Sequence, residues 1–444
     1  IYQARCEVDG NRICTPIKVA VSLGGSCIAV GANGGWKNRE PVVHYYFHKA
    51  YSIDPGLAEP VTQLALDDDR KLIFVADGDR VKSFSWKGGK GSPVHTLNSM
   101  TSGPIAILPR GHIIRAGDGR FDYWRIDELE VHGPKKKLIG RGKYNIDDLG
   151  RDNDYDEVER SNGSDAHGRI KLEQTRFCPQ ALHVHQPTGR ILCGETTPAS
   201  HDGGYGCVAI DLEHGGKTAI RYLGHGGTVV SFSTGDFDPY TLATACSDGF
   251  ARDYDVRQKL LILTMDTSNL PFESVVCHTH DYATALFTGG SKTERIQMWD
   301  IRARRTVYEL ATGNNAVASM AWDKHRSTLW AATECEYMDR NGTRHEYRKA
   351  RIRRDGTENL NNADAEGFSD GGSDEDSDEE EEGYLDEDEH DCCWPNHAYH
   401  GEDYFGYTFD AGDHRIYRYA FKADAKTAVV PEYGDATMGE ENDW

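Results

Sequence analysis

Residues 242–257 (LATACSDGFARDYDVR) and residues 286–302 (LFTGGSKTERIQMWDIR) share one organisation. Each consists of a strand of small residues, a polar turn, and an alternating strand that ends in an aromatic residue, an acid, an aliphatic residue and an arginine. The two aromatic residues, Tyr254 and Trp299, are 299 − 254 = 45 positions apart. A repeat of about 45 residues is typical of the four-stranded blades of a β-propeller. The pair therefore predicts an all-β fold built from repeated blades.

The same pattern recurs along the chain and predicts seven blades. Alternating strand pairs separated by turns are found at 17–47, 61–86, 104–127, 177–211, 229–257, 273–302 and 317–421. One position near the end of each blade, here called the blade marker, is aromatic or bulky; the seven are Tyr45, Phe84, Trp124, Ile210, Tyr254, Trp299 and Tyr419. Neighbouring markers are 39, 40, 86, 44, 45 and 120 residues apart. The two long intervals require insertions.

Two insertions are visible in the composition. Residues 141–171 are rich in Asp, Asn, Gly and Arg and predict a loop between blades 3 and 4. Residues 335–404 predict an insertion between the second and third strands of blade 7. We expect both to emerge on the same face of the propeller, which leaves the opposite face plainer.

The second insertion is basic and then strongly acidic. Residues 344–354 contain six Arg or Lys, whereas residues 363–391 contain sixteen Asp or Glu and no Lys or Arg. Since the net charge is −22, the rest of the chain carries −22 + 16 = −6. The acidic run has three interpretations: a solvated tract, a binding segment for basic proteins, or a partner for the basic stretch that precedes it.

The ends of the chain suggest how the ring closes. Residues 1–8 (IYQARCEV) form a lone strand without a blade, and blade 7 lacks a fourth strand because residues 422–444 are a polar tail. We expect the N-terminal strand to complete blade 7, which would remove a free sheet edge. The alternative is a frayed N-terminus.

The chain resembles the WD40 family. Gly224-His225, Asp248-Gly249, Tyr254-Asp255 and Trp299-Asp300 stand where that family has its Gly-His, turn aspartate and Trp-Asp. The resemblance implies a single seven-bladed WD40-type propeller with a buried hydrogen-bond chain in blade 5. Its members would be His225, Thr244, Asp248 and Tyr254, and tyrosine in place of tryptophan is a departure from the family.

Two arginines give the most specific functional prediction. Asp255-Val-Arg257 and Asp300-Ile-Arg302 resemble the doubled WDxR box of WD40 proteins that serve as substrate receptors of cullin-4 ubiquitin ligases. The resemblance implies that Arg257, Asp300 and Arg302 contact the ligase adaptor from the plainer face. The alternative is that each arginine only packs on the next blade.

Catalytic motifs are not found: the chain has no GxSxG, no Walker-type loop and no HExxH. The weak metal candidates are His390, Cys392, Cys393, His397 and His400, whose spacing matches no standard zinc motif. We therefore expect no cofactor and a non-catalytic scaffold that binds protein partners. The alternatives are an enzyme or sugar-binding propeller with an axial site near His201, Asp202 and His225, and a structural subunit of a larger assembly.

Composition and charge limit the classes of partner and the cellular compartment that we expect for this chain. The acidic net charge disfavours nucleic-acid binding, and no apolar run is long enough to span a membrane. Eleven cysteines are an odd number, and several, such as Cys27, Cys193 and Cys246, lie in apolar strands. This usage predicts reduced, buried thiols and a cytoplasmic or nuclear protein.

Overall fold

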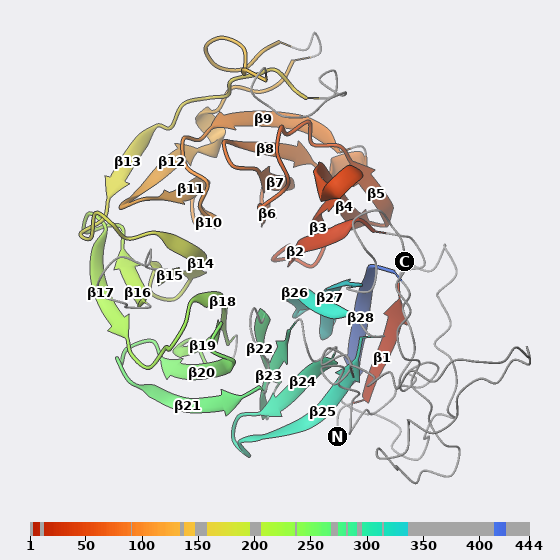
Figure 1. Cartoon of the computed structure of the whole chain (residues 1–444), viewed down its shortest axis with the longest axis vertical. Helices are drawn as coiled ribbons and strands as arrows, with labels where there is room; N and C mark the ends of the chain where they lie inside the picture. The colour runs from red at the N-terminus through yellow and green to blue at the C-terminus, as the bar shows by residue number, and fades with distance from the viewer. Residues whose placement is uncertain are drawn as a thin grey trace, which may run out of the picture.

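Seven antiparallel sheets of four strands each form a closed ring around a central axis in the computed structural model (Figure 1). The structure describes residues 3–8, 13–89, 91–133, 137–146, 158–195, 206–235, 238–267, 274–280, 283–290, 295–312, 315–335 and 413–422. The all-β, seven-bladed prediction is confirmed. None of the helices in these segments is long and apolar enough to cross a bilayer.

Blades 1 to 3 follow one another from the N-terminal side, each running from the inner to the outer strand. Blade 1 comprises β2 (Thr15–Val21), β3 (Ile28–Gly34), β4 (Glu40–Phe47) and β5 (Lys49–Ile53). Blade 2 comprises β6 (Gln63–Asp67), β7 (Leu72–Ala76), β8 (Arg80–Ser85) and β9 (Ser92–Asn98). Blade 3 comprises β10 (Ile105–Leu108), β11 (His112–Gly117), β12 (Arg120–Arg125) and β13 (Gly168–Lys171).

Blades 4 to 6 repeat this arrangement. Blade 4 comprises β14 (Pro179–His185), β15 (Arg190–Glu195), β16 (Gly206–Asp211) and β17 (Lys217–Tyr222). Blade 5 comprises β18 (Val229–Thr234), β19 (Thr241–Cys246), β20 (Phe250–Asp255) and β21 (Leu261–Asp266). Blade 6 comprises β22 (Ser274–His280), β23 (Ala283–Gly289), β24 (Arg295–Asp300) and β25 (Arg305–Ala311).

Blade 7 joins the two ends of the chain. Its strand order is β1-β28-β27-β26, where β1 is Gln3–Val8, β26 is Ala316–Asp323, β27 is Thr328–Glu334 and β28 is Arg415–Lys422. β1 pairs antiparallel with β28, so that Cys6 lies opposite Tyr419. Figure 1 shows the red N-terminal strand beside the blue C-terminal one. The predicted closure is confirmed: the N-terminal strand is the outer strand of the last blade.

The blade markers all occupy the third strand of their blade. Each lies opposite a residue of the second strand, as Tyr254 lies opposite Leu242 and Trp299 opposite Leu286. Every marker is buried. The core is divided into clusters that mostly join adjacent blades; one cluster, for example, unites residues of blades 4 and 5. The 45-residue period therefore reflects one packed aromatic or aliphatic anchor per blade.

Small residues in the second strands allow neighbouring blades to approach closely. A Cβ atom on Gly194 would lie 2.4 Å from the backbone oxygen of Val229 in the next blade. On Gly289 it would lie 2.8 Å from a Val317 methyl group of the next blade. These distances are shorter than real contacts allow, so the small-residue strands seen in the sequence are a packing requirement.

The boundaries predicted for the first insertion were wrong. Residues 168–171 are strand β13, which pairs with β12 so that Gly168 lies opposite Tyr123. The insertion therefore lies within blade 3, between its third and fourth strands, and not between blades 3 and 4. A strand of four residues next to a long polar segment has too little alternation to be recognised in the sequence.

The same insertion is more ordered than a solvated loop. Ser164 forms a parallel bridge with Leu97 of the outer strand β9, and its N–H donates to Thr96 O at 2.9 Å. Ile139, Ile146 and Val158 are buried. This segment thus covers the edge of blade 2, where an exposed strand would otherwise invite association.

The two insertions leave from opposite faces, contrary to the prediction. Strands of a blade alternate in direction, so its second connection lies on one face of the ring and its third on the other. Blade 7 carries its insertion in the second connection, between β27 and β28, as predicted. Blade 3 carries its insertion in the third. Residues 336–412, including the acidic run, and the tail 423–444 lie outside the described residues.

Candidate functional site

The predicted hydrogen-bond chain of blade 5 is largely assembled. His225 Nε2 and Thr244 Oγ1 are 3.0 Å apart, and the imidazole stacks on Tyr254 with 5.4 Å between ring centroids. Tyr254 OH donates to Leu223 O at 2.9 Å. Burial lowers the pKa of His225 to about 4, so its ring is neutral at pH 7. These residues therefore define blade geometry.

Asp248 has different partners from those the resemblance implies. Its carboxylate accepts the Gly226 N–H at 2.7 Å and two N–H groups of Arg252 at 2.9 and 2.7 Å. Arg252 is buried, and its ion pair with Asp248 stabilises the turn. Asp248 therefore pairs with Arg252 where the resemblance implies a link to the imidazole. The sequence pattern did not point to Arg252, although its position two residues before Tyr254 places both on the same face of β20.

Blade 6 contains the tryptophan version of the same contact. Trp299 Nε1 donates to Thr288 Oγ1 at 2.9 Å, and Thr288 follows Leu286 by two residues, as Thr244 follows Leu242. In blade 5 the tyrosine hydroxyl bonds to Leu223 O instead, and Thr244 bonds to His225. The tyrosine thus changes the hydrogen-bond partners while it keeps the anchor buried.

Arg257 lies in the turn between β20 and β21 and is held in place by two neighbours. Asp255 accepts the Arg257 backbone N–H at 2.9 Å, the Nε–H at 2.8 Å and an Nη2 proton at 2.6 Å. The guanidinium carbon lies 3.9 Å from the centroid of the Tyr240 ring. The Arg257 side chain is still 59% exposed. The arginine is therefore fixed in conformation and accessible.

Asp300 and Arg302 form the equivalent turn of blade 6. The Asp300 carboxylate accepts the backbone N–H groups of Arg302 and Ala303, both at 2.9 Å. Arg302 is exposed. Asp300 was predicted to contact a partner, but its carboxylate stabilises the turn itself. Any effect of Asp300 on a partner would therefore depend on how it positions Arg302.

Exposed apolar side chains lie on the same part of blade 5. Tyr240 is 40% exposed, Leu260 67% and Ile262 57%. Leu260 belongs to the turn that carries Arg257, and Ile262 belongs to the outer strand β21. We call Tyr240, Arg257, Leu260 and Ile262 the blade 5 corner. The blade 5 corner could not be predicted from the sequence pattern, because Tyr240 contacts Arg257 from a different turn.

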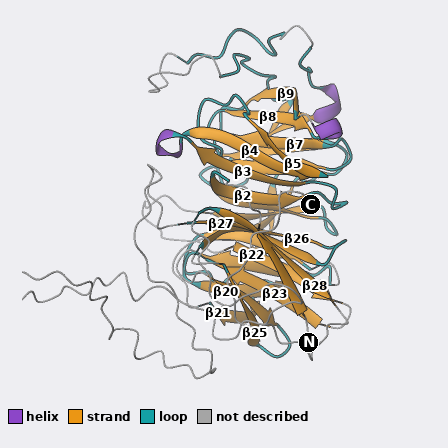
Figure 2. Ribbon diagram, turned by 90° about the vertical axis from the view of Figure 1, so that its right-hand side faces the viewer, coloured by secondary structure: helices purple, strands orange, loops and turns teal. Residues whose placement is uncertain are grey.

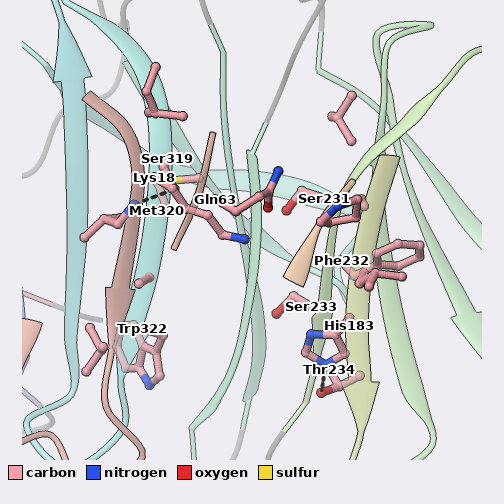
Figure 3. Close-up of a pocket in the computed structure, with 18 of the residues that line it drawn as sticks. Lys18, Gln63, His183, Ser231, Phe232, Ser233, Thr234, Ser319, Met320 and Trp322 are labelled. Carbon is pink, nitrogen blue, oxygen red and sulfur yellow. Dashed lines mark hydrogen bonds between the residues drawn. The ribbon is translucent and has the colours of Figure 1, made fainter. Parts of the chain in front are cut away.

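A cavity of about 490 Å³ occupies the axis of the ring, lined mainly by the inner strands β2, β14, β18 and β26. Lys18, Gln63, His183, Ser231 and Ser233 contribute to its wall (Figure 3). His225, which was predicted to line an axial site, does not line this cavity because it is held against Thr244 and Tyr254 in blade 5.

Several predicted site residues lie outside the part of the chain that the structure describes. They are His201 and Asp202 of the axial alternative and the weak metal candidates His390, Cys392, Cys393, His397 and His400. Among the described residues, no group of three or more His, Cys, Asp or Glu side chains could hold a metal ion. Cys27, Cys193 and Cys246 are free and buried, as predicted.

No protein-family model matches the chain, and no curated protein is significantly similar to it. The seven-bladed propeller therefore rests on the structure, and the resemblance to the WD40 family rests on the residues of blades 5 and 6 alone.

Proposed function

We propose that this chain is a non-catalytic scaffold that binds a protein partner through the turns carrying Arg257 and Arg302. The main support for this proposal is the state of the Arg257 side chain. Asp255 and Tyr240 hold its guanidinium in one conformation, while more than half of the side chain is exposed. A side chain that is already ordered loses little entropy on binding. Arginine and tyrosine are also the residue types enriched at interface hot spots.

Other side chains on the same face also suit a protein-binding surface. Arg302 occupies the equivalent turn of the next blade, so the two arginines share a face of the ring. Leu260 and Ile262 add apolar surface beside Arg257. Polar anchors next to exposed apolar groups are the usual composition of a protein-binding surface.

The resemblance suggests a particular partner for this face, the adaptor of a cullin-4 ubiquitin ligase. The chain would then be a WD40-type substrate receptor in the cytoplasm or nucleus. Its blade 7 insertion leaves from the opposite face, so adaptor and substrate would bind on different sides of the ring. Basic substrates would be attracted by the acidic run in that insertion.

Co-purification with the purified adaptor tests this proposal. Arg257→Ala combined with Arg302→Ala should remove most of the captured adaptor, since both charge-assisted anchors are lost. Arg169→Ala is the matched control, because Arg169 is 55% exposed and also pairs with a carboxylate, that of Asp122. The ligase assignment is wrong if the double variant captures as much adaptor as the wild type.

A further inference from the structure

The axial cavity is shaped by one irregularity that four inner strands share. β2, β14, β18 and β26 each contain a β-bulge that leaves one residue without a partner on the second strand: Ile17, Gln180, Val230 and Ala318 respectively. All four line the cavity, and so do the residues that follow them. A bulge redirects side chains that strict alternation would place on the other face. The repeated bulge thus turns two successive residues of each strand towards the axis.

The bulge in β2 turns the charged residue Lys18 towards the cavity. Lys18 follows the bulged Ile17 on β2, and its side chain is partly buried. Among the described residues, its ammonium has neither an ion pair nor a hydrogen bond. Burial lowers the pKa of Lys18, which reflects the cost of removing an unpaired charge from water.

The other titratable groups of the cavity do not neutralise Lys18. The Asp323 carboxylate is occupied by Arg326 at 2.7 Å and by the backbone N–H of His325. Lys324 and His325 lie at the same mouth and carry no negative charge. His183 is neutral at pH 7, because burial and then the charges of His185 and Lys18 lower its pKa to about 4. The lining therefore carries a net positive charge.

Neutral polar groups share the wall of the cavity with Lys18. Lys18 and Ser319 lie on one side, Ser231, Ser233 and His183 on the other, with Gln63 between them (Figure 3). His183 Nε2 and Thr234 Oγ1 are 3.0 Å apart, which fixes the imidazole. Hydroxyl and amide groups can donate to an oxyanion, and the volume falls within the range of roughly 300–1,000 Å³ typical of small-ligand sites.

We propose that the axial cavity binds a small anion with a carboxylate or phosphate group, for which Lys18 is the charge partner and Gln63, Ser231 and Ser233 are the hydrogen-bonding groups. The site lies on the axis, away from the blade 5 corner, so it does not depend on the proposed docking face. The proposal explains why a cation lies among hydroxyl and amide groups without a carboxylate partner.

Calorimetry and thermal unfolding of the full chain test the proposal with citrate and inorganic phosphate, using sodium chloride at equal ionic strength as the reference. At least one of the two anions should bind and raise Tm, and the stronger response identifies the preferred acid. Lys18→Met should weaken binding at least tenfold and, without anion, should raise Tm because a partly buried, unpaired charge is removed. Lys18→Arg should retain part of the binding.

Lys217→Met is the matched control, since Lys217 is an exposed lysine on the outer strand of blade 4. It should change neither affinity nor Tm. The proposal is overturned if neither anion binds, or if Lys18→Met binds as tightly as the wild type.

Discussion

The Asp255 carboxylate receives two hydrogen bonds from the Arg257 guanidinium, at 2.8 and 2.6 Å, although the two residues are only two positions apart in the sequence. The same carboxylate also accepts the Arg257 backbone N–H. These bonds hold the pKa of Asp255 below its usual range, so the pair stays charged at neutral and mildly acidic pH. The turn thus presents an arginine whose conformation does not depend on a partner.

Arg257→Ala should separate binding from stability. The Arg257 side chain is exposed and water screens its ion pair with Asp255, so we expect the free energy of unfolding to change little. Adaptor affinity should nevertheless fall at least tenfold, as for a hot-spot arginine. Urea unfolding and calorimetric titration measure the two quantities. A large loss of stability with unchanged affinity would assign Arg257 to blade packing.

Removal of residues 1–8 should open the ring. β28 would lose its neighbour β1 and become an exposed edge, so Tm should fall and association between molecules should increase. Differential scanning calorimetry and size-exclusion chromatography measure these effects. A synthetic peptide of sequence IYQARCEV should restore part of the lost Tm, and a scrambled peptide should not. An unchanged Tm in the truncated chain would contradict the closure.

Thr288→Val should destabilise the protein by about 1–3 kcal/mol, because the buried Trp299 indole N–H loses its acceptor. Thr264→Val is a suitable control, since Thr264 is exposed on β21 and should change the free energy of unfolding by less than about 0.5 kcal/mol. Urea unfolding provides the comparison. Equal effects of the two substitutions would show that the Trp299 contact does not stabilise blade 6.

Stability should decrease on acidification between pH 6.5 and about 4. Burial, the largest cause in each case, lowers the pKa of His95, His183 and His225 to about 4, against 6.5 for the ordinary side chain. In that window the unfolded chain binds more protons, so stability is complete above pH 6.5 and is lost as pH falls through 4. Each histidine contributes up to about 3 kcal/mol.

His225→Gln isolates one of these contributions. The variant should show a shallower dependence of the free energy of unfolding on pH between 6.5 and 4 than the wild type. His48→Gln is the control, because His48 is exposed in the turn between β4 and β5. Parallel pH profiles for wild type and His225→Gln would contradict the assigned role of the buried ring.

The sequence predicted the repeat well because the period depends on local features. Tyr254 and Trp299 are bulky residues at the end of alternating strands, and such residues must be buried in every blade. The lone strand at residues 1–8 was assigned correctly because an all-β ring leaves one strand missing in blade 7. Both inferences need only strand pattern and spacing.

The sites were harder to predict because they depend on contacts between distant residues. Tyr240 reaches Arg257 from another turn, and Arg252 takes the Asp248 carboxylate that the resemblance assigns to the hydrogen-bond chain of His225. Lys18 could not be placed on the axis from alternation alone, since the bulge at Ile17 breaks the two-residue period. Strand β13 was missed because it has only four residues.

Hydrogen exchange of the full chain, with and without the purified adaptor, tests the central claim most directly, because it shows which face is covered. We predict slower exchange in the turns around Arg257 and Arg302 and no change in the turn at Asp248, which lies on the opposite face. Slower exchange at the Asp248 turn, with Arg257 and Arg302 unaffected, would contradict the docking face proposed for this propeller.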